Sequence, residues 1–133
     1  GEGARGEAQR RKVTICGKVG DVLLGGVSGN GVVRFDDFLE LRIVDGVAEL
    51  AFTDDSVGQG RTVRQALCGE VHDLRILVDT SVLEIFLKGG ETVFGTRYYA
   101  ETDALTLCAT FGRIGEAAAW SMRPLSVNYL VTR

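Results

Sequence analysis

The stretch that decides the fold is LELRIVDGVAELAF, residues 39–52. Its two halves alternate apolar and polar residues around the pair Asp45-Gly46. Asp-Gly supplies the positive φ angles of a two-residue type I′ turn, whose twist matches that of two antiparallel strands. The stretch therefore predicts a β-hairpin with one solvated face and one buried face. On the first strand, the buried face carries Leu39, Leu41 and Ile43.

A second hairpin is predicted downstream in LRILVDTSVLEIFLKGGETVFGTR, residues 74–97. Residues 74–78 form a lead-in strand, and residues 83–87 pair with residues 91–94 through the turn Lys88-Gly89-Gly90. Residues 116–120 could wind into a helical turn, but the glycine before them favours a strand. Further short strands are expected at 13–16, 19–24, 31–35, 61–66, 97–100, 104–110, 114–121 and 126–131.

This spacing of short strands, with no helical period, predicts the fold class. We expect an all-β protein built as a two-sheet antiparallel β-sandwich of the concanavalin-like or lectin-like jelly-roll type. A chain of 133 residues with 45% hydrophobic and 25% charged residues fits one domain. Residues 1–12 contain no large apolar side chain, so we expect a linker or disordered lead-in there. The single β-sandwich domain then spans residues 13–133.

The charge balance and the apolar pattern exclude several classes of partner. The formal net charge is −3, and the only basic cluster is residues 10–12, so we expect no nucleic-acid partner. No stretch reaches the roughly 18 consecutive apolar residues of a membrane-spanning helix, so we expect no membrane partner. The N-terminus lacks the apolar region of a signal peptide, which says nothing about secretion if Gly1 is not the native start.

The cysteine and histidine content predicts neither a metal nor a cofactor. The three cysteines, Cys16, Cys68 and Cys108, are far apart in the sequence, without a CxxC pair. We expect them to be reduced, buried hydrophobes, which weakly favours a cytoplasmic location. His72 is the one histidine, and its place beside a strand favours a structural or surface role.

Two carboxylates, Asp79 and Glu84, lie within an otherwise apolar stretch. Such a pair could perform the acid/base work of a glycosidase. The alternative is a structural turn, in which Asp79 accepts backbone amides near Ser81. We favour the turn, and expect Asp79, Ser81, Glu84 and Arg97 to form a polar brace around the hairpin.

Exposed aromatic rings would point to sugar binding, because a sugar face stacks on a ring. Tyr98 and Tyr99 are the adjacent candidates for a sugar contact. Since neighbouring residues of a strand point to opposite faces, one ring should face inward and the other outward. The alternative, that these aromatics lie in or around the core, is the more common arrangement.

Residues 74–97 resemble the signature of the C-terminal β-sandwich module of glycoside hydrolase family 32. That signature reads approximately L-R-I-F-V-D-x-S-S-x-E-x-F-x-N-D/G-G-E-x-V-x-x-S-R. Trp120 is similar to the tryptophan of the module's closing strand, and we expect Trp120 and Phe86 to anchor the core. The matching positions are Leu74, Arg75, Ile76, Val78, Asp79, Ser81, Glu84, Phe86, Gly90, Glu91, Val93 and Arg97.

The resemblance implies a non-catalytic accessory domain of a β-fructofuranosidase, such as an invertase, fructanase or sucrose-6-phosphate hydrolase. In that family the catalytic carboxylates lie in an N-terminal five-bladed propeller, within W-x-N-D-P-N-G, R-D-P and E-C motifs. None of these strings occurs here, so no catalytic residue is assigned and the chain alone is expected to be inactive.

Three roles are therefore open for the chain. The first is to support a propeller in the same polypeptide and, in some members, to assemble homo-oligomers. The second is that of a free-standing lectin-like carbohydrate-binding module. The third is a free-standing interaction domain without a sugar ligand. The polar lead-in and the family resemblance favour the first role.

Overall fold

The computed structural model describes residues 8–17, 19–53, 63–98, 104–121 and 129–132. These residues form strands and one short 3-10 turn, Lys88–Gly90, and contain no helix long and apolar enough to cross a membrane. The strands are β1 Gln9–Cys16, β2 Val19–Gly25, β3 Ser28–Phe35, β4 Leu39–Val44, β5 Val47–Phe52, β6 Arg64–Leu67, β7 Asp73–Asp79, β8 Val82–Leu87, β9 Thr92–Arg97, β10 Ala104–Arg113, β11 Glu116–Ser121 and β12 Tyr129–Thr132.

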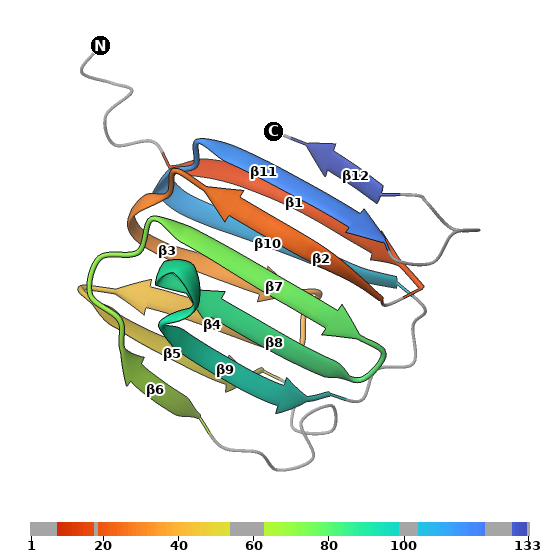
Figure 1. Ribbon diagram of the computed structural model, residues 1–133, viewed down its shortest axis with the longest axis horizontal. Coiled ribbons are helices and arrows are strands. Elements are labelled where there is room, and N and C mark those ends of the chain that lie inside the picture. The colour runs from red at the N-terminus through yellow and green to blue at the C-terminus, as the bar shows by residue number, and fades with distance from the viewer. Residues whose placement is uncertain (1–7, 18, 54–62, 99–103, 122–128, 133) are drawn as a thin grey trace.

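The strands form two antiparallel sheets packed face to face (Figure 1). One sheet has seven strands in the order β12-β1-β10-β3-β4-β5-β6, and the other has five in the order β11-β2-β7-β8-β9. Strands that are neighbours in sequence often lie in different sheets, as β1 and β2 do. The predicted two-sheet antiparallel β-sandwich is confirmed.

A single apolar core fills the space between the sheets. Strands such as β4, β7, β8 and β10 contribute every second residue to this core, as the period of two requires. Among the described residues, the largest fully buried side chains are Tyr98, Phe35, Phe111, Ile15, Leu39, Leu41, Leu74, Ile76, Leu83, Ile85, Leu87 and Leu105.

The hairpin predicted from residues 39–52 is confirmed. Strands β4 and β5 pair from Leu39 opposite Phe52 to Val44 opposite Val47. Both turn residues have positive φ, 50° at Asp45 and 82° at Gly46, as a type I′ turn requires. The apolar residues expected on the inner face are all buried, namely Leu39, Leu41 and Ile43.

Several strand boundaries differ from the sequence prediction. Strand β1 begins at Gln9 rather than Val13, because its backbone pairs with β10 from Gln9 opposite Phe111 onward. Backbone pairing needs no apolar side chain, so the polar composition of residues 9–12 does not indicate that they form a strand. Arg97 ends β9 rather than opening a new strand at 97–100, of which residues 99–100 lie outside the described part. Residues 116–121 form a strand, as favoured over the helical turn.

Gly31 has a packing role in the centre of the seven-stranded sheet. It lies on β3 directly opposite Phe111 of β10, and it is buried. A Cβ atom at position 31 would overlap the ring of Phe111. Because glycine has no side chain, the ring of Phe111 can pack against position 31 in the core.

We predict that Gly31→Ala lowers the free energy of unfolding by about 1–3 kcal/mol, since overpacking a core displaces its side chains. Chemical denaturation of the 133-residue chain measures this change. Gly95→Ala is the matched control, because Gly95 is exposed on the edge strand β9 and a Cβ there would meet no atom within 4 Å. Its stability should stay within about 0.5 kcal/mol of the parent chain. Equal effects of the two substitutions would contradict the packing role.

Tyr98 follows β9 and lies fully buried between the sheets. Its ring stacks on Phe38 with 5.3 Å between the ring centroids. Its amide donates to the carbonyl of Ser81, which continues the β8–β9 pairing by one residue. Burial, and to a smaller extent the charge of Asp36, raises the pKa of Tyr98 to about 12.

This raised pKa predicts a loss of stability at alkaline pH. The unfolded tyrosine ionises near pH 10, so the folded state holds the proton more tightly between about pH 10 and 12. The corresponding stability is present below pH 10 and is lost as the pH rises through this range. We predict that Tyr98→Phe makes the slope of unfolding free energy against pH shallower there, by up to about one proton. Denaturant titrations at a series of pH values measure the slope, and parallel slopes for both chains would contradict the prediction.

Candidate functional site

The outer face of the five-stranded sheet combines apolar and charged side chains. Trp120 on β11 is 40% exposed and Leu23 on β2 is 39% exposed. Leu77 and Phe86 lie half-buried on the neighbouring strands β7 and β8. We call this surface the mixed face, and it comprises Asp21, Leu23, Arg75, Leu77, Glu84, Phe86 and Trp120.

An ion pair between Asp21 and Arg75 lies at the centre of the mixed face. The Nη2 of Arg75 lies 2.8 Å from Oδ2 of Asp21, and its Nε lies 3.2 Å from Oδ1. Asp21 is buried while Arg75 remains half-exposed. The hydrogen bonds to Asp21 raise the pKa of the Arg75 guanidinium. The pair neutralises a carboxylate that its surroundings shield from water.

The expectation that Phe86 and Trp120 anchor the core is wrong. Leu83, Ile85 and Leu87 are the core residues of β8, so alternation turns Phe86 to the outer face. On β11, Ala119 is buried and Trp120 points outward. Both aromatic rings therefore belong to the mixed face.

The expected polar brace does not form as a direct network. Asp79, Glu84 and Arg97 are all exposed on the outer side of the five-stranded sheet. Asp79 and Arg97 are both register partners of Val82, so a whole strand separates them. Among the described contacts, Asp79 accepts only from the Thr80 hydroxyl at 3.4 Å. No described hydrogen bond or ion pair joins the four expected residues.

Gly90 and Glu91, two further signature residues, lie in the turn between β8 and β9. Gly90 has a φ of 103°, which only glycine adopts readily. The Glu91 carboxylate lies 3.8 Å from Lys88 Nζ. The carboxylate of Asp73 holds the same turn by accepting the Gly89 amide at 2.9 Å. These residues shape the hairpin.

The two tyrosines expected as sugar contacts do not form a described surface site. Tyr98 is fully buried against Phe38, so its ring offers no face to a sugar. Tyr99 lies outside the described residues. Tyr98 is therefore a core residue, the alternative that the sequence left open.

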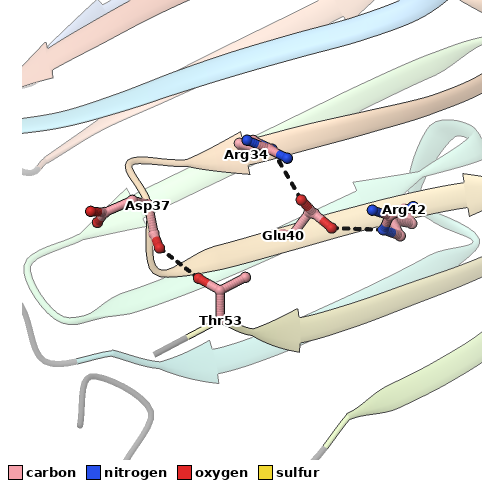
Figure 2. Close-up of polar contacts among 5 residues, drawn as sticks. All are labelled: Arg34, Asp37, Glu40, Arg42 and Thr53. Carbon is pink, nitrogen blue, oxygen red and sulfur yellow. Dashed lines mark hydrogen bonds and ion pairs between the residues drawn. The ribbon is translucent and has the colours of Figure 1, made fainter. Parts of the chain in front are cut away.

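The outer face of the seven-stranded sheet carries a different, polar arrangement. The two oxygens of Glu40 accept from Nε of Arg34 at 3.0 Å and from Nε of Arg42 at 2.6 Å (Figure 2). Farther along the same row, Gln65 donates to Glu49 at 2.7 Å. We call this set the polar ladder, and it runs across β3 to β6 as Arg34, Glu40, Arg42, Glu49 and Gln65.

A pocket of about 200 Å3 adjoins the polar ladder at the turn between β3 and β4. Its lining residues are Arg34, Asp36, Asp37, Leu39, Glu40 and Thr53. The Thr53 hydroxyl donates to the carbonyl of Asp37 at 2.5 Å (Figure 2). The Thr106 amide donates to the Asp36 carboxylate at 3.0 Å. These bonds hold the turn against β5 and β10.

Burial raises the pKa of the Asp36 carboxyl above its ordinary value, although the Thr106 amide acts in the opposite direction. The negative charge of neighbouring Asp37 adds to the rise. Asp36 has a φ of 51°, a left-handed conformation that aspartate tolerates better than most residues. The described residues contain no group of three or more metal-ligating side chains.

The contact of Arg34 with Glu40 was not predicted from the sequence. The signal was present, because a turn over residues 36–38 places Phe35 opposite Leu39 and therefore Arg34 opposite Glu40. Opposite charges at such cross-strand positions commonly pair. Finding the contact required the register of the β3–β4 hairpin, which no Asp-Gly turn marks.

Several solved structures share this fold. A glycoside hydrolase family 32 structure from Bifidobacterium adolescentis matches 83% of this chain with a TM-score of 0.70 and 18% sequence identity. The chain spans only 19% of the length of that protein. A toad ovary galectin in complex with thio-digalactose matches 81% of this chain and 97% of its own, with a TM-score of 0.55 and 10% identity.

A variant of human galectin-16 gives a TM-score of 0.61 at 12% identity, covering 83% of this chain and 94% of its own. These likenesses establish the lectin-like sandwich. No curated protein sequence matches the chain significantly.

The sequence itself decides the family. The family described as "Glycosyl hydrolases family 32 C terminal" matches residues 44–121, which is more than half of the chain. The matched segment runs from the end of β4 through β11, so it includes β7, β8 and β9. The chain therefore belongs to the glycosyl hydrolase family 32 C-terminal domains.

Proposed function

We propose that this chain is the non-catalytic accessory domain of a family 32 β-fructosidase, and that it stabilises a catalytic propeller in the same polypeptide. The mixed face is the surface that packs against the propeller. The propeller carries out the hydrolysis of sucrose, sucrose 6-phosphate or a fructan. The family match of residues 44–121 is the observation that carries this proposal.

The distribution of the signature residues supports the mixed face as the contact surface. Core packing accounts for the inward-facing signature positions, such as Leu74 and Ile76. Core packing does not account for Arg75, Glu84 and Phe86, which point outward. Signature residues on both faces of the sheet are expected for a domain whose outer face contacts another domain.

The composition of the mixed face supports the same contact. Leu23 and Trp120 lie on adjacent strands, and the nearby charges of Asp21 and Arg75 already neutralise one another. Docking around Leu23 and Trp120 therefore removes apolar surface from water, and it covers Asp21 and Arg75 as a neutral pair. A contact that retains polar groups is typical of interfaces between domains of one chain.

We predict that the 133-residue chain alone does not hydrolyse sucrose. Retaining glycosidases need two carboxylates on opposite sides of the scissile bond, about 5 Å apart. The exposed carboxylates of Asp79 and Glu84 lie on an open sheet surface, where no described contact positions either of them for proton transfer. Reducing-sugar assays on the purified chain measure the activity. Robust release of fructose, abolished by Glu84→Gln, would contradict the assignment.

The docking face is tested in the full-length protein by Leu23→Asp. We predict that a charge buried at the interface shortens the half-life of sucrose hydrolysis at elevated temperature by at least about fivefold. The same substitution in the 133-residue chain should change its unfolding free energy little, because Leu23 is 39% exposed there.

Val44→Asp is the matched control for this experiment. Val44 is 44% exposed, but it lies on β4, on the outer side of the other sheet. Its half-life should equal that of the parent enzyme. Equal half-lives for all three proteins would overturn the mixed face as the docking surface. Sedimentation of the same proteins shows whether a second copy occupies the face instead, in which case Leu23→Asp dissociates an oligomer.

A further inference from the structure

We propose that the polar ladder and its adjoining pocket bind a neutral carbohydrate ring. The site lies on the outer side of the seven-stranded sheet, away from the mixed face. This inference does not depend on the proposed packing against a propeller. It rests on the hydrogen-bonding groups, the charge and the rigidity of the residues around Glu40.

The two arginines of the ladder supply hydrogen-bond donors. In the described contacts, Arg34 and Arg42 each bind Glu40 through Nε (Figure 2). A guanidinium carries five N–H donors, so four donors of each arginine remain beyond this contact. Both side chains are exposed, and their terminal amino groups are accessible to a ligand from solvent.

Acceptors lie beside these donors. Asp37 and Glu40 line the same pocket as Arg34. Each oxygen of an ionised carboxylate has two lone pairs, and the two arginines use one on each oxygen of Glu40. A hydroxyl group donates one hydrogen bond and accepts others. Adjacent fixed donors and acceptors therefore suit the neighbouring hydroxyls of a sugar.

The charge of the site favours a neutral ligand over an ion. Two arginines, Arg34 and Arg42, lie among four acidic residues, which are Asp36, Asp37, Glu40 and Glu49. This balance gives an anion such as phosphate no net attraction. Glu40 is already paired with both arginines, so its carboxylate is not free to bind a cation together with its acidic neighbours. A polyhydroxyl compound needs no net charge.

The site is preorganised. The Glu40 side chain is only 13% exposed, and Arg34 and Arg42 each bind one of its two oxygens. The turn over residues 36–38 is fixed by the bonds of Asp36 to Thr106 and of Thr53 to Asp37. A ligand therefore loses little affinity to ordering of the protein. The pocket of about 200 Å3 is smaller than the roughly 300–1,000 Å3 of drug-sized sites and suits one sugar ring.

The test is a titration of the isotopically labelled 133-residue chain, followed by two-dimensional amide NMR. The probes are D-fructose and D-galactose up to about 100 mM, with inorganic phosphate and calcium chloride in parallel. We expect saturable shifts with at least one sugar, confined to residues 34–42 and 49–53. Glu40→Gln should raise the dissociation constant at least about tenfold, because it removes the charge that orients both arginines.

Glu84→Gln is the matched control, since Glu84 is an exposed carboxylate on the other sheet and should leave the dissociation constant within about twofold. Asp37→Asn is the second test variant. Its side chain is exposed, so the fold should survive, and the affinity should again fall. The proposal is overturned if neither sugar gives saturable shifts, if the shifts cluster elsewhere, or if only phosphate or calcium binds. Equal weakening by Glu40→Gln and Glu84→Gln would also overturn it.

Discussion

The register of the strands is the constraint on which the rest of the structure depends. The two sheets share one core, so each strand must turn its apolar residues inward. A slip of one residue in β4 would place Glu40 and Arg42 in that core and expose Leu41. The Asp45-Gly46 turn and the Gly31–Phe111 contact fix the register at two points of the seven-stranded sheet. The outer faces acquire their composition as a consequence.

The two outer faces differ because alternation leaves different residues on each. On the five-stranded sheet, the outward positions include Leu23, Phe86 and Trp120 around one ion pair. On the seven-stranded sheet, Arg34 and Arg42 both bind Glu40. Exposed ion pairs contribute little stability, so the polar ladder is not what holds the sheet together. The core performs that task and leaves both surfaces available for contacts with other molecules.

The sequence predicted the fold well and the surfaces poorly. Asp45-Gly46 marks a turn that local geometry alone decides, and the alternation around it is confirmed. Phe86 is expected in the core, although Ile85 and Leu87 beside it already require it to face outward. The pairing of residues 9–12 and the contact between Arg34 and Glu40 depend on which strands become neighbours. Such information is not local to any stretch of sequence.

The back-to-back arrangement of the sheets allows both proposed contacts to form at once. Packed sheets lie about 10 Å apart, and the apolar core fills the space between them. A partner domain on the mixed face therefore leaves Glu40 and its pocket open to solvent. A weak sugar site that is tethered to a catalytic domain increases the local concentration of its ligand, which a free module with the same affinity cannot do. Millimolar binding at the polar ladder would then be sufficient to hold a polymeric ligand, because many sugar units of one polymer lie close to the same site.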